Sequence, residues 1–458
     1  MPASRFPIPA TIFARASGAG RTGVMIIRVS GPKALEAAAA LCGRLPAPKR
    51  AALRSIRDLA GDLIDQGLVI LFKGPNSFTG EDVAEFHLHG SPAVEAAIYE
   101  ALSALGARPA EAGEFTKRAL LNGKLDLAEV EGLADLLDAE TSMQRKQALG
   151  QFGGRLSAVA EDWREGLLAI LTPLEADIDF PDEEDVPAAI AAKAGPEIKA
   201  LIGELERYRA QSAAAKAIRE GVRVAIIGAP NAGKSSLLNR LAGSDRAIVA
   251  ETPGTTRDVI EVRLDLGGML VSLFDTAGLR ESAADTVELE GMRRTRMTAE
   301  GADIRILMID VSRETLDPGR AAAEGGNLPV SLLREGDFVV FNKIDVAPAP
   351  RMAGMAGAAS FAVSVRTGAG IDALVDALTH ALASRMRSDD AILTRVRHTA
   401  AVEAAISFLE AALASLATAP ELAAEDVRMA ARSLGEITGA VGVEDVLEQI
   451  FSSFCIGK

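Results

Sequence analysis

The sequence of 458 residues contains little cysteine, few aromatic side chains and no long apolar run. Its two cysteines, Cys42 and Cys455, are far apart and lack the spacing of metal ligands, which argues against a disulfide framework or a zinc site. No stretch approaches the roughly 20 uninterrupted apolar residues that cross a membrane. The first residues also lack the apolar core of a signal peptide. We therefore expect a cytoplasmic protein with no membrane segment.

Basic residues are also in the minority, because 49 Lys and Arg stand against 63 Asp and Glu and give a net charge of −14. This balance argues against a uniformly basic nucleic-acid binder, although a local basic patch can still bind a phosphate backbone. The remaining composition, with 48% hydrophobic and 24% charged residues, is that of a globular protein. A chain of this length is too long for one core and predicts two to four domains.

Three kinds of pattern divide the chain. Residues 1–121 mix short apolar runs with glycine turns and alanine-rich helical stretches, and predict an α+β domain. Residues 122–219 and 383–458 have the apolar spacing of helices. Between them, residues 220–382 alternate apolar strands with helical segments, which is typical of an α/β domain inserted into a helical one. The strands expected there are residues 270–274, 304–309, 338–341 and 361–365.

A phosphate-binding loop opens the α/β domain. Residues 228–235, GAPNAGKS, have the Gly-x4-Gly-Lys-Ser spacing between an apolar strand and a helix-like segment. The glycines let backbone N–H groups point at phosphate oxygens, and Lys234 can neutralise the charge of the β- and γ-phosphates. The Ser235 hydroxyl can bind Mg²⁺. The loop therefore predicts a nucleotide site.

Later motifs complete the nucleotide site and follow strands: DTAG at 275–278, NKID at 342–345 and SVR at 364–366. Asp275 is placed to hold a water of the metal ion, and Gly278 to meet the γ-phosphate. The carboxylate of Asp345 can accept from two nitrogen donors on the guanine edge, which adenine cannot supply. Thr256, in GTTRD at 254–258, can bind Mg²⁺ and the γ-phosphate. The order and spacing predict a Ras-like GTPase domain.

The group that orients the attacking water is left open by the pattern. Leu279 stands where Ras-like GTPases carry the glutamine that positions this water. Several acids downstream could replace it or could simply be solvated, and these are Glu281, Asp285, Glu288 and Glu290. Asn231 could share a monovalent cation with phosphate oxygens, or could only favour the turn after Pro230.

Along nearly the whole chain the sequence resembles the MnmE (TrmE) family. Besides the GTPase motifs, the resemblance rests on residues 23–32 (GVMIIRVSGP), 77–85 (SFTGEDVAE), 113–119 (GEFTKRA), 122–127 (NGKLDL) and 454–458 (FCIGK). The sequence departs from the family's glycine-rich loops where it has GRTG at 20–23 and LHGS at 88–91. The resemblance implies an N-terminal folate-binding-like α+β domain, an all-α helical domain and an inserted Ras-like P-loop GTPase domain.

The resemblance also implies roles in the GTPase domain. Glu288 becomes the water-orienting acid, acting beside Asp275 and Lys234. Mg²⁺ would be bound by Ser235 and Thr256, and K⁺ by Asn231, Ala250, Thr252 and Thr255. The GTP-binding residues that it implies are Asn231, Ala232, Gly233, Lys234, Ser235, Ser236, Ala250, Glu251, Thr252, Pro253, Gly254, Thr255, Thr256, Asp275, Thr276, Ala277, Gly278, Asn342, Lys343, Asp345, Ser364, Val365 and Arg366.

In the flanking domains the resemblance implies that 5-formyl-tetrahydrofolate is bound by Arg28, Glu85, Lys124 and Lys458. Arginine and lysine suit carboxylate or carbonyl groups of this ligand, and a carboxylate suits the N–H donors of a pterin ring. Cys455 would take part in the chemistry at uridine. The alternative for Cys455 is a small apolar side chain that packs the tail.

The function implied by the resemblance is GTP-dependent modification of tRNA by a homodimer, in which the N-terminal domains dimerise and the GTPase domains dimerise in a K⁺-dependent way. With the flavoprotein partner MnmG, in a heterotetramer that uses FAD and NADH, such a protein adds an aminomethyl or carboxymethylaminomethyl group at carbon 5 of the wobble uridine. Two alternatives are a ribosome-assembly or RNA-binding GTPase that acts only as a timer, and a plain folate-dependent transferase. The flanking segments, which include no recognisable compact RNA-binding module, argue against the timer, and the intact GTPase motifs argue against the transferase.

Overall fold

A computed structural model of the chain describes residues 10–179, 189–248, 261–275, 297–312, 330–349, 357–385, 391–440, 454 and 457. These residues belong to two compact units. The first unit comprises residues 1–134, 151–198 and 407–458, and the second comprises residues 135–150 and 199–406. In the described part of the chain, no helix is both long enough and apolar enough to cross a membrane.

A six-stranded sheet forms the N-terminal part of the first unit, with the strand order β3-β4-β5-β2-β1-β6. Its strands are β1 (Ile12–Arg15), β2 (Thr22–Ser30), β3 (Ala52–Arg57), β4 (Leu63–Phe72), β5 (Val83–Gly90) and β6 (Arg108–Pro109). Neighbouring strands are antiparallel except β1 and β6, which are parallel. Because side chains alternate between the faces of a strand, Met25, Ile27 and Val29 of β2 enter the core while Arg28 lies on the opposite face.

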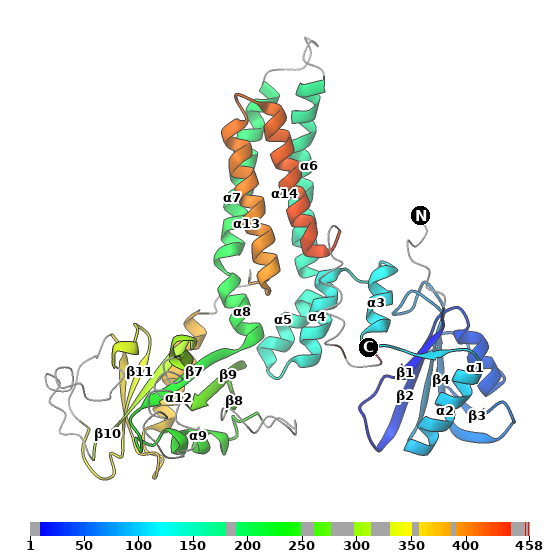
Figure 1. Cartoon of the computed structure of the whole chain (residues 1–458), viewed down its shortest axis with the longest axis horizontal. Coiled ribbons are helices and arrows are strands. Elements are labelled where there is room, and N and C mark those ends of the chain that lie inside the picture. The colour runs from blue at the N-terminus through cyan, green and yellow to red at the C-terminus, as the bar shows by residue number, and fades with distance from the viewer. Residues whose placement is uncertain are drawn as a thin grey trace, which may run out of the picture. The chain divides into compact units, whose positions relative to one another are not determined.

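Helices α1 (Ala34–Cys42) and α2 (Pro92–Ala104) cover the core face of this sheet (Figure 1). Helix α2 begins where the Ser91 hydroxyl accepts from the backbone N–H of Val94 at 3.2 Å, with Pro92 as its first residue. On the opposite face, helix α3 (Glu114–Leu121) packs on β1 through Phe115. We call the face of β2, β3, β4 and β5 that lies opposite α1 and α2 the open face, because Leu53 and Leu68 on it are exposed.

Helices from both ends of the chain pack together in the first unit. Helix α4 (Leu127–Asp138) follows the sheet, and α6 (Arg155–Asp179) lies along α14 (Pro420–Thr438) (Figure 1). The buried stripe of α14 has helical spacing and consists of Ala423, Ala424, Val427, Ala430, Leu434 and Ile437. Arg428 donates to Glu175 of α6 at 2.8 Å. Helices α7 (Ala189–Ala210) and α13 (Val396–Ser415) contribute residues to both units.

The second unit contains the α/β domain, whose sheet has the order β12-β11-β10-β7-β9-β8. Its strands are β7 (Val222–Gly228), β8 (Glu261–Leu266), β9 (Met269–Asp275), β10 (Ile304–Asp310), β11 (Phe338–Asn342) and β12 (Ala359–Val363). All neighbours are parallel except β8 and β9. Helices α9 (Lys234–Ala242) and α12 (Ile371–Arg385) cover one face, and a short 3₁₀ helix, η1 (Val330–Leu332), precedes β11. The buried central strands are rich in Val, Ile and Leu because both of their faces are covered.

Helix α5 (Ser142–Phe152) precedes the α/β domain in sequence, yet residues 135–150 group with that domain. At its start, the N–H of Met143 donates to the carbonyl oxygen of Gly268 at 3.1 Å, in the turn between β8 and β9. Gly268 has a φ of +90°, and a Cβ atom there would lie 2.6 Å from Ser142 Oγ. The turn therefore packs closely on α5, and its backbone conformation and this contact both favour glycine.

The same helix also contacts both connections of the α/β domain. The Nε2 of Gln147 donates to the carbonyl oxygen of Ala215, in α8 (Ser212–Glu220), at 3.0 Å. It also donates to the carbonyl oxygen of Ala391, after α12, at 3.4 Å. One side chain of α5 thus joins the segment that leads into the α/β domain to the segment that leads out of it.

Candidate functional site

The loop between β7 and α9 depends on close backbone approaches. Gly228 and Gly233 have φ values of +148° and +102°. A side chain at Gly228 would meet the carbonyl oxygen of Met308 at 2.3 Å, and one at Gly233 would meet Asn342 Nδ2 at 2.2 Å. Because glycine removes both collisions, the loop lies against the ends of β10 and β11 at the N-terminus of α9. This is the position in which backbone dipoles favour a bound phosphate.

Lys234, the first residue of α9, is only 5% exposed and folds back over the loop. Its Nζ donates to the carbonyl oxygens of Gly228 and Ala229, each at 2.9 Å. Burial lowers the pKa of Lys234, and the negative charge of Asp275 opposes this shift. A phosphate beside Nζ would further stabilise the buried ammonium group.

Ser235 and Asp275 meet at the same edge of the sheet. The Ser235 hydroxyl donates to Oδ2 of Asp275, which ends β9 and is almost fully buried. Asp275 lies opposite Ile226, just before the phosphate-binding loop, because β7 and β9 are parallel. The two side chains offer hard oxygen ligands side by side, and this chemistry fits Mg²⁺.

Asn342, at the end of β11, connects the phosphate-binding loop with the next loop of the site. Its Nδ2 donates to the carbonyl oxygen of Ala232 at 2.8 Å, and its Oδ1 accepts from the N–H of Val365 at 3.1 Å. The side chain is buried and both ends of its amide are bonded. Asn342 therefore holds the phosphate and base regions of the site together.

Asp345, the predicted guanine-binding carboxylate, is held by two side chains of the following loop. Its Oδ1 accepts from the Ser364 hydroxyl at 2.6 Å, and its Oδ2 accepts from Arg366 Nε at 2.9 Å. The hydrogen bond from Ser364 lowers the pKa of Asp345, and the charge of Arg366 adds to this effect. The group is therefore an ionised acceptor at neutral pH. Arg366 is highly exposed, so its guanidinium can move away from Asp345 and leave the carboxylate to accept from the N–H groups of a base.

A second polar constellation lies on the open face of the N-terminal sheet. Arg28 of β2 and Glu85 of β5 are direct cross-strand partners, with Arg28 Nε 2.9 Å from Glu85 Oε1. The other carboxylate oxygen lies 3.4 Å from His87 Nε2. The Arg28 guanidinium is 5.7 Å from the ring centre of Phe78 and 5.8 Å from that of Phe115. Arg28 therefore pairs with a carboxylate and lies beside two aromatic rings.

Lys124 lies against the loop that carries Phe78. A Cβ atom on Gly80, whose φ is +77°, would lie 3.2 Å from Lys124 Cγ. The preceding segment is tied to the same loop, because Asn122 Nδ2 donates to the carbonyl oxygen of Thr79 at 2.7 Å. Loop 77–81 thus connects Lys124 with the surroundings of Arg28.

The end of the chain returns to the N-terminal sheet. Phe454 is buried among residues of α4. Gly457 approaches β1 so closely that a Cβ atom would lie 2.0 Å from the carbonyl oxygen of Arg15. Arg15 follows Ala14, the cross-strand partner of Arg28. Gly457 therefore lies beside β1, which pairs with the strand that carries Arg28. The N-terminal sheet, α4 and the end of the chain, which are far apart in the sequence, meet in the first unit.

Comparison with known proteins follows the same division of the chain. A family model described as GTP-binding protein TrmE N-terminus matches residues 11–124, and one described as MnmE helical domain matches residues 127–455. A protein named tRNA modification GTPase MnmE, from Caulobacter vibrioides, is 48% identical over 455 residues, which are 98% of this chain and 99% of that protein. The chain belongs to the MnmE family.

Other relatives agree with this membership of the MnmE family. A protein of the same name from Parvibaculum lavamentivorans is 50% identical over 456 residues, covering 98% of this chain and 100% of the relative. Among solved structures, Era of Aquifex aeolicus with GDP and aluminium fluoride is 26% identical and covers 35% of this chain and 56% of that chain, with a TM-score of 0.26. A TM-score this low carries no further argument.

Membership of the MnmE family confirms the predicted fold class: an N-terminal α+β domain, a helical domain and an inserted Ras-like P-loop domain. It also confirms, at the level of the family, the prediction of a GTPase of tRNA modification. The predicted domain boundaries, at residues 121, 219 and 382, stay predictions.

The structure adds residues to this MnmE-family site that the motifs did not single out. Arg240 of α9 donates to the carbonyl oxygen of Val365 at 2.8 Å and so braces the base loop. Asp310, at the end of β10, was not singled out either, and its Oδ2 lies 2.5 Å from Nζ of the predicted Lys343. Phe78 belongs to a quoted family segment, but its place beside Arg28 depends on the fold.

Several predicted residues of the MnmE-family site lie outside the described residues. The described part includes Asn231, which is exposed and has a φ of +65°, and Ser236 in α9. The predicted residues outside it are Ala250, Glu251, Thr252, Pro253, Gly254, Thr255, Thr256, Thr276, Ala277, Gly278, Glu288, Cys455 and Lys458. Their assignments stay predictions.

Proposed function

We propose that this chain is a GTP-hydrolysing enzyme that modifies the wobble uridine of certain tRNAs in the cytoplasm. With an MnmG-type flavoprotein, in a heterotetramer that uses FAD and NADH, it adds an aminomethyl or carboxymethylaminomethyl group at carbon 5. The main support is the 48% identity to a tRNA modification GTPase across 98% of the chain. The support from geometry is a guanine-reading carboxylate at Asp345 in the same chain as the polar constellation around Arg28.

In the proposed GTPase cycle, the phosphate-binding loop and Lys234 hold the β- and γ-phosphates, and Asp345 selects guanine. Ser235 would bind Mg²⁺ together with Thr256, with Asp275 beside them, and the ion would neutralise charge that develops on the phosphates. Asn231, Ala250, Thr252 and Thr255 would hold K⁺, and Glu288 would orient water. Asn231 is exposed and has a left-handed backbone in the phosphate-binding loop, which supports the K⁺ assignment.

In the proposed folate site, Arg28, Glu85, Lys124 and Lys458 hold a tetrahydrofolate derivative such as 5-formyl-tetrahydrofolate. Carboxylate or carbonyl groups of this ligand suit Arg28 and Lys124, and ring N–H donors suit Glu85. The aromatic faces of Phe78 and Phe115 suit a flat heterocycle. Cys455 would take part in the uridine chemistry near this ligand.

A homodimer formed through the N-terminal domains is supported by the open face. Leu53, Leu68, His87 and Ile26 form one cross-strand row on adjacent strands. Leu53 and Leu68 are 65% and 42% exposed. The solvent face of an antiparallel sheet normally carries polar side chains, so exposed leucines here favour a second copy of the chain as the partner.

The decisive experiment is mass spectrometry of tRNA nucleosides from cells that lack the protein. We expect the modified wobble uridine to disappear and to return with the wild-type gene, but not with Lys234→Ala or Glu288→Ala. Unchanged wobble uridines would overturn the proposal. If ribosomal subunits accumulated abnormally while the tRNA was unchanged, the ribosome-assembly timer would replace it.

A further inference from the structure

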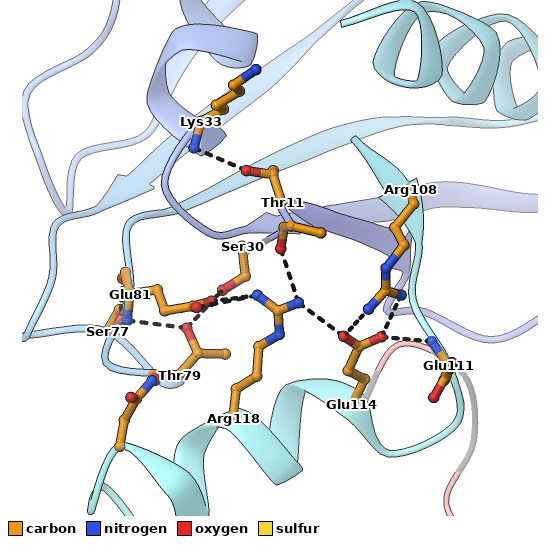
Figure 2. A network of polar contacts seen from close by, with 12 residues as sticks. Thr11, Ser30, Lys33, Ser77, Thr79, Glu81, Arg108, Glu111, Glu114 and Arg118 are labelled. Atoms are coloured by element: carbon orange, nitrogen blue, oxygen red, sulfur yellow. Dashed lines mark hydrogen bonds and ion pairs between the residues drawn. The ribbon is translucent and has the colours of Figure 1, made fainter. Parts of the chain in front are cut away.

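Arg118 is the centre of a buried polar network in the N-terminal domain (Figure 2). Its side chain, which is 4% exposed, projects from α3. Nη1 lies 3.1 Å from both carboxylate oxygens of Glu81. Nη2 donates to Glu114 at 2.8 Å and to the carbonyl oxygen of Ala10 at 3.0 Å. One guanidinium therefore joins α3, the segment before β1 and loop 77–81.

Glu81 is tied from its other side to β2. Ser30, at the end of β2, donates its hydroxyl to Glu81 Oε2 at 2.7 Å and lies 2.7 Å from Thr79 Oγ1 (Figure 2). Ser77 Oγ donates to the carbonyl oxygen of Glu81 at 2.5 Å, which closes the loop on itself. Loop 77–81 is thus closed between its two ends and anchored through the half-buried carboxylate of Glu81.

The fixed loop bears directly on the proposed folate residues. It presents Phe78 to the guanidinium of Arg28, two residues before Ser30 on the same strand. It packs Gly80 against the stem of Lys124, and Thr79 accepts from Asn122, two residues before that lysine. A displacement of the loop would therefore change the separation of Arg28 and Lys124, which lie on different elements.

We infer that Arg118 and Glu81 form a positioning pair that sets the spacing of Arg28 and Lys124 for a reduced folate. This inference rests on the proposed folate site. A buried, doubly bonded ion pair is a poor source of net stability, because desolvation offsets most of its attraction. It does fix geometry, since a guanidinium and a carboxylate meet in a defined orientation. The pair touches no proposed ligand group itself and acts through loop 77–81.

The test measures 5-formyl-tetrahydrofolate binding to the full-length protein by calorimetry, with GTP affinity and the unfolding midpoint measured on the same samples. We expect Arg118→Lys and Glu81→Gln to weaken folate binding roughly 10- to 100-fold, by analogy with groups that orient the ligands of a metal ion. GTP affinity should stay unchanged. Arg108→Lys is the matched control, because Arg108 binds Glu114 from the same network but makes its other described bond to Pro109.

A double variant, Arg118→Met with Glu81→Met, separates positioning from stability. Replacing a buried ion pair with apolar side chains of similar size often restores stability, but it cannot restore a defined loop orientation. We expect the unfolding midpoint to rise above that of Arg118→Met alone, although Glu114 still loses its bond from Arg118, while folate binding stays weak. Recovery of both, or an equal loss in Arg108→Lys, would overturn the inference.

Two further outcomes distinguish this inference from the function on which it rests. If the wild-type protein does not bind the folate, or if Arg28→Ala and Lys124→Ala bind it normally, the folate site itself is wrong and the inference falls with it. If those two variants lose binding while Arg118→Lys and Glu81→Gln stay within threefold of the wild type, only the positioning role is wrong. Should Glu81→Gln fail to fold, Ser30→Ala provides the milder test, because it removes the Ser30 bonds to Glu81 and Thr79 and leaves the Arg118–Glu81 pair in place.

Discussion

Asp345 is the residue proposed to select guanine in the GTPase domain. Asp345→Asn exchanges one acceptor oxygen for a donor, so the side chain no longer matches the two donors of guanine. It does match xanthine, which has an oxygen in place of the guanine amino group. We expect GTP affinity to fall by roughly 100-fold or more and xanthosine triphosphate to become the better substrate. Hydrolysis of both nucleotides in parallel measures this exchange, and unchanged GTP preference would contradict it.

Glu114 makes the N-terminal domain sensitive to acid. Burial would raise the pKa of Glu114, but hydrogen bonds from Arg108 and Arg118 outweigh it and lower the pKa below 4.5. Because the folded state holds this proton less tightly than the unfolded state, the contribution is fully present above the unfolded pKa. It is lost as the pH falls through the lower folded value.

The matching measurement is urea unfolding between pH 7 and pH 3. We expect Glu114→Gln to cost about 2–4 kcal/mol at pH 7, because the buried guanidinium of Arg118 then keeps only one of its two carboxylate partners. The difference from the wild type should shrink as the pH falls below about 4.5. Glu111→Gln removes the same charge three residues away and should have little effect. A difference that does not depend on pH would contradict the linkage.

At the residue scale, the spacing of the motifs predicted the candidate binding residues, but it did not predict the residues that hold them in position. The phosphate-binding loop, Asp275 and Asp345 were predicted because their motifs are short and follow strands. The packing of Phe78 and Phe115 on Arg28 was not, because these residues come from a loop and a helix that only the tertiary fold brings to β2. Arg118 was missed for the same reason, since its partners lie up to 108 residues away.

The contact between α5 and the turn of β8 and β9 gives a prediction at the scale of elements. Gly267→Ala and Gly268→Ala share a positive φ, so they share backbone strain. A Cβ at Gly268 also meets Ser142 Oγ at 2.6 Å, whereas one at Gly267 meets only Thr379 Cγ2 at 3.2 Å. We expect Gly268→Ala to cost about 1–3 kcal/mol more than Gly267→Ala.

The measurement is the thermal or urea unfolding of each variant. The relevant unfolding step is the one that added GDP stabilises, because this step reports the unit that contains the nucleotide site. Adding Ser142→Ala to Gly268→Ala should return most of the extra loss. If the two glycine variants were equally stable, α5 would not be packed on this turn.

Helices and strands could be predicted from the sequence where apolar residues recur with a clear spacing. The strands expected at 304–309 and 338–341 lie within one residue of β10 and β11. β12 ends at Val363, two residues early, because the backbone of Ser364 already turns to bond with Ala369. The grouping of α5 with the α/β domain could not be predicted, since it depends on the Met143 and Gln147 contacts with distant segments.

For the whole molecule, the open face predicts a dimer that one charge can disrupt. Leu68→Lys places an ammonium group in the apolar row between β3 and β5, so we expect monomers in sedimentation equilibrium at concentrations where the wild type is dimeric. Leu149→Lys is the control, because Leu149 is 43% exposed, like Leu68, but lies on α5. A dimer that survives Leu68→Lys would contradict the assignment of this face.

Gln147 has a consequence for how the chain can be cut and rejoined. The carbonyl oxygens of Ala215 and Ala391 accept from the same nitrogen at 3.0 and 3.4 Å, so the two backbones lie within about two residue lengths of each other. A few flexible residues could therefore bridge them after the intervening segment is removed. In engineering terms, the GTPase domain is a cassette with adjacent ends, suited to excision, circular permutation or transplantation into another host protein.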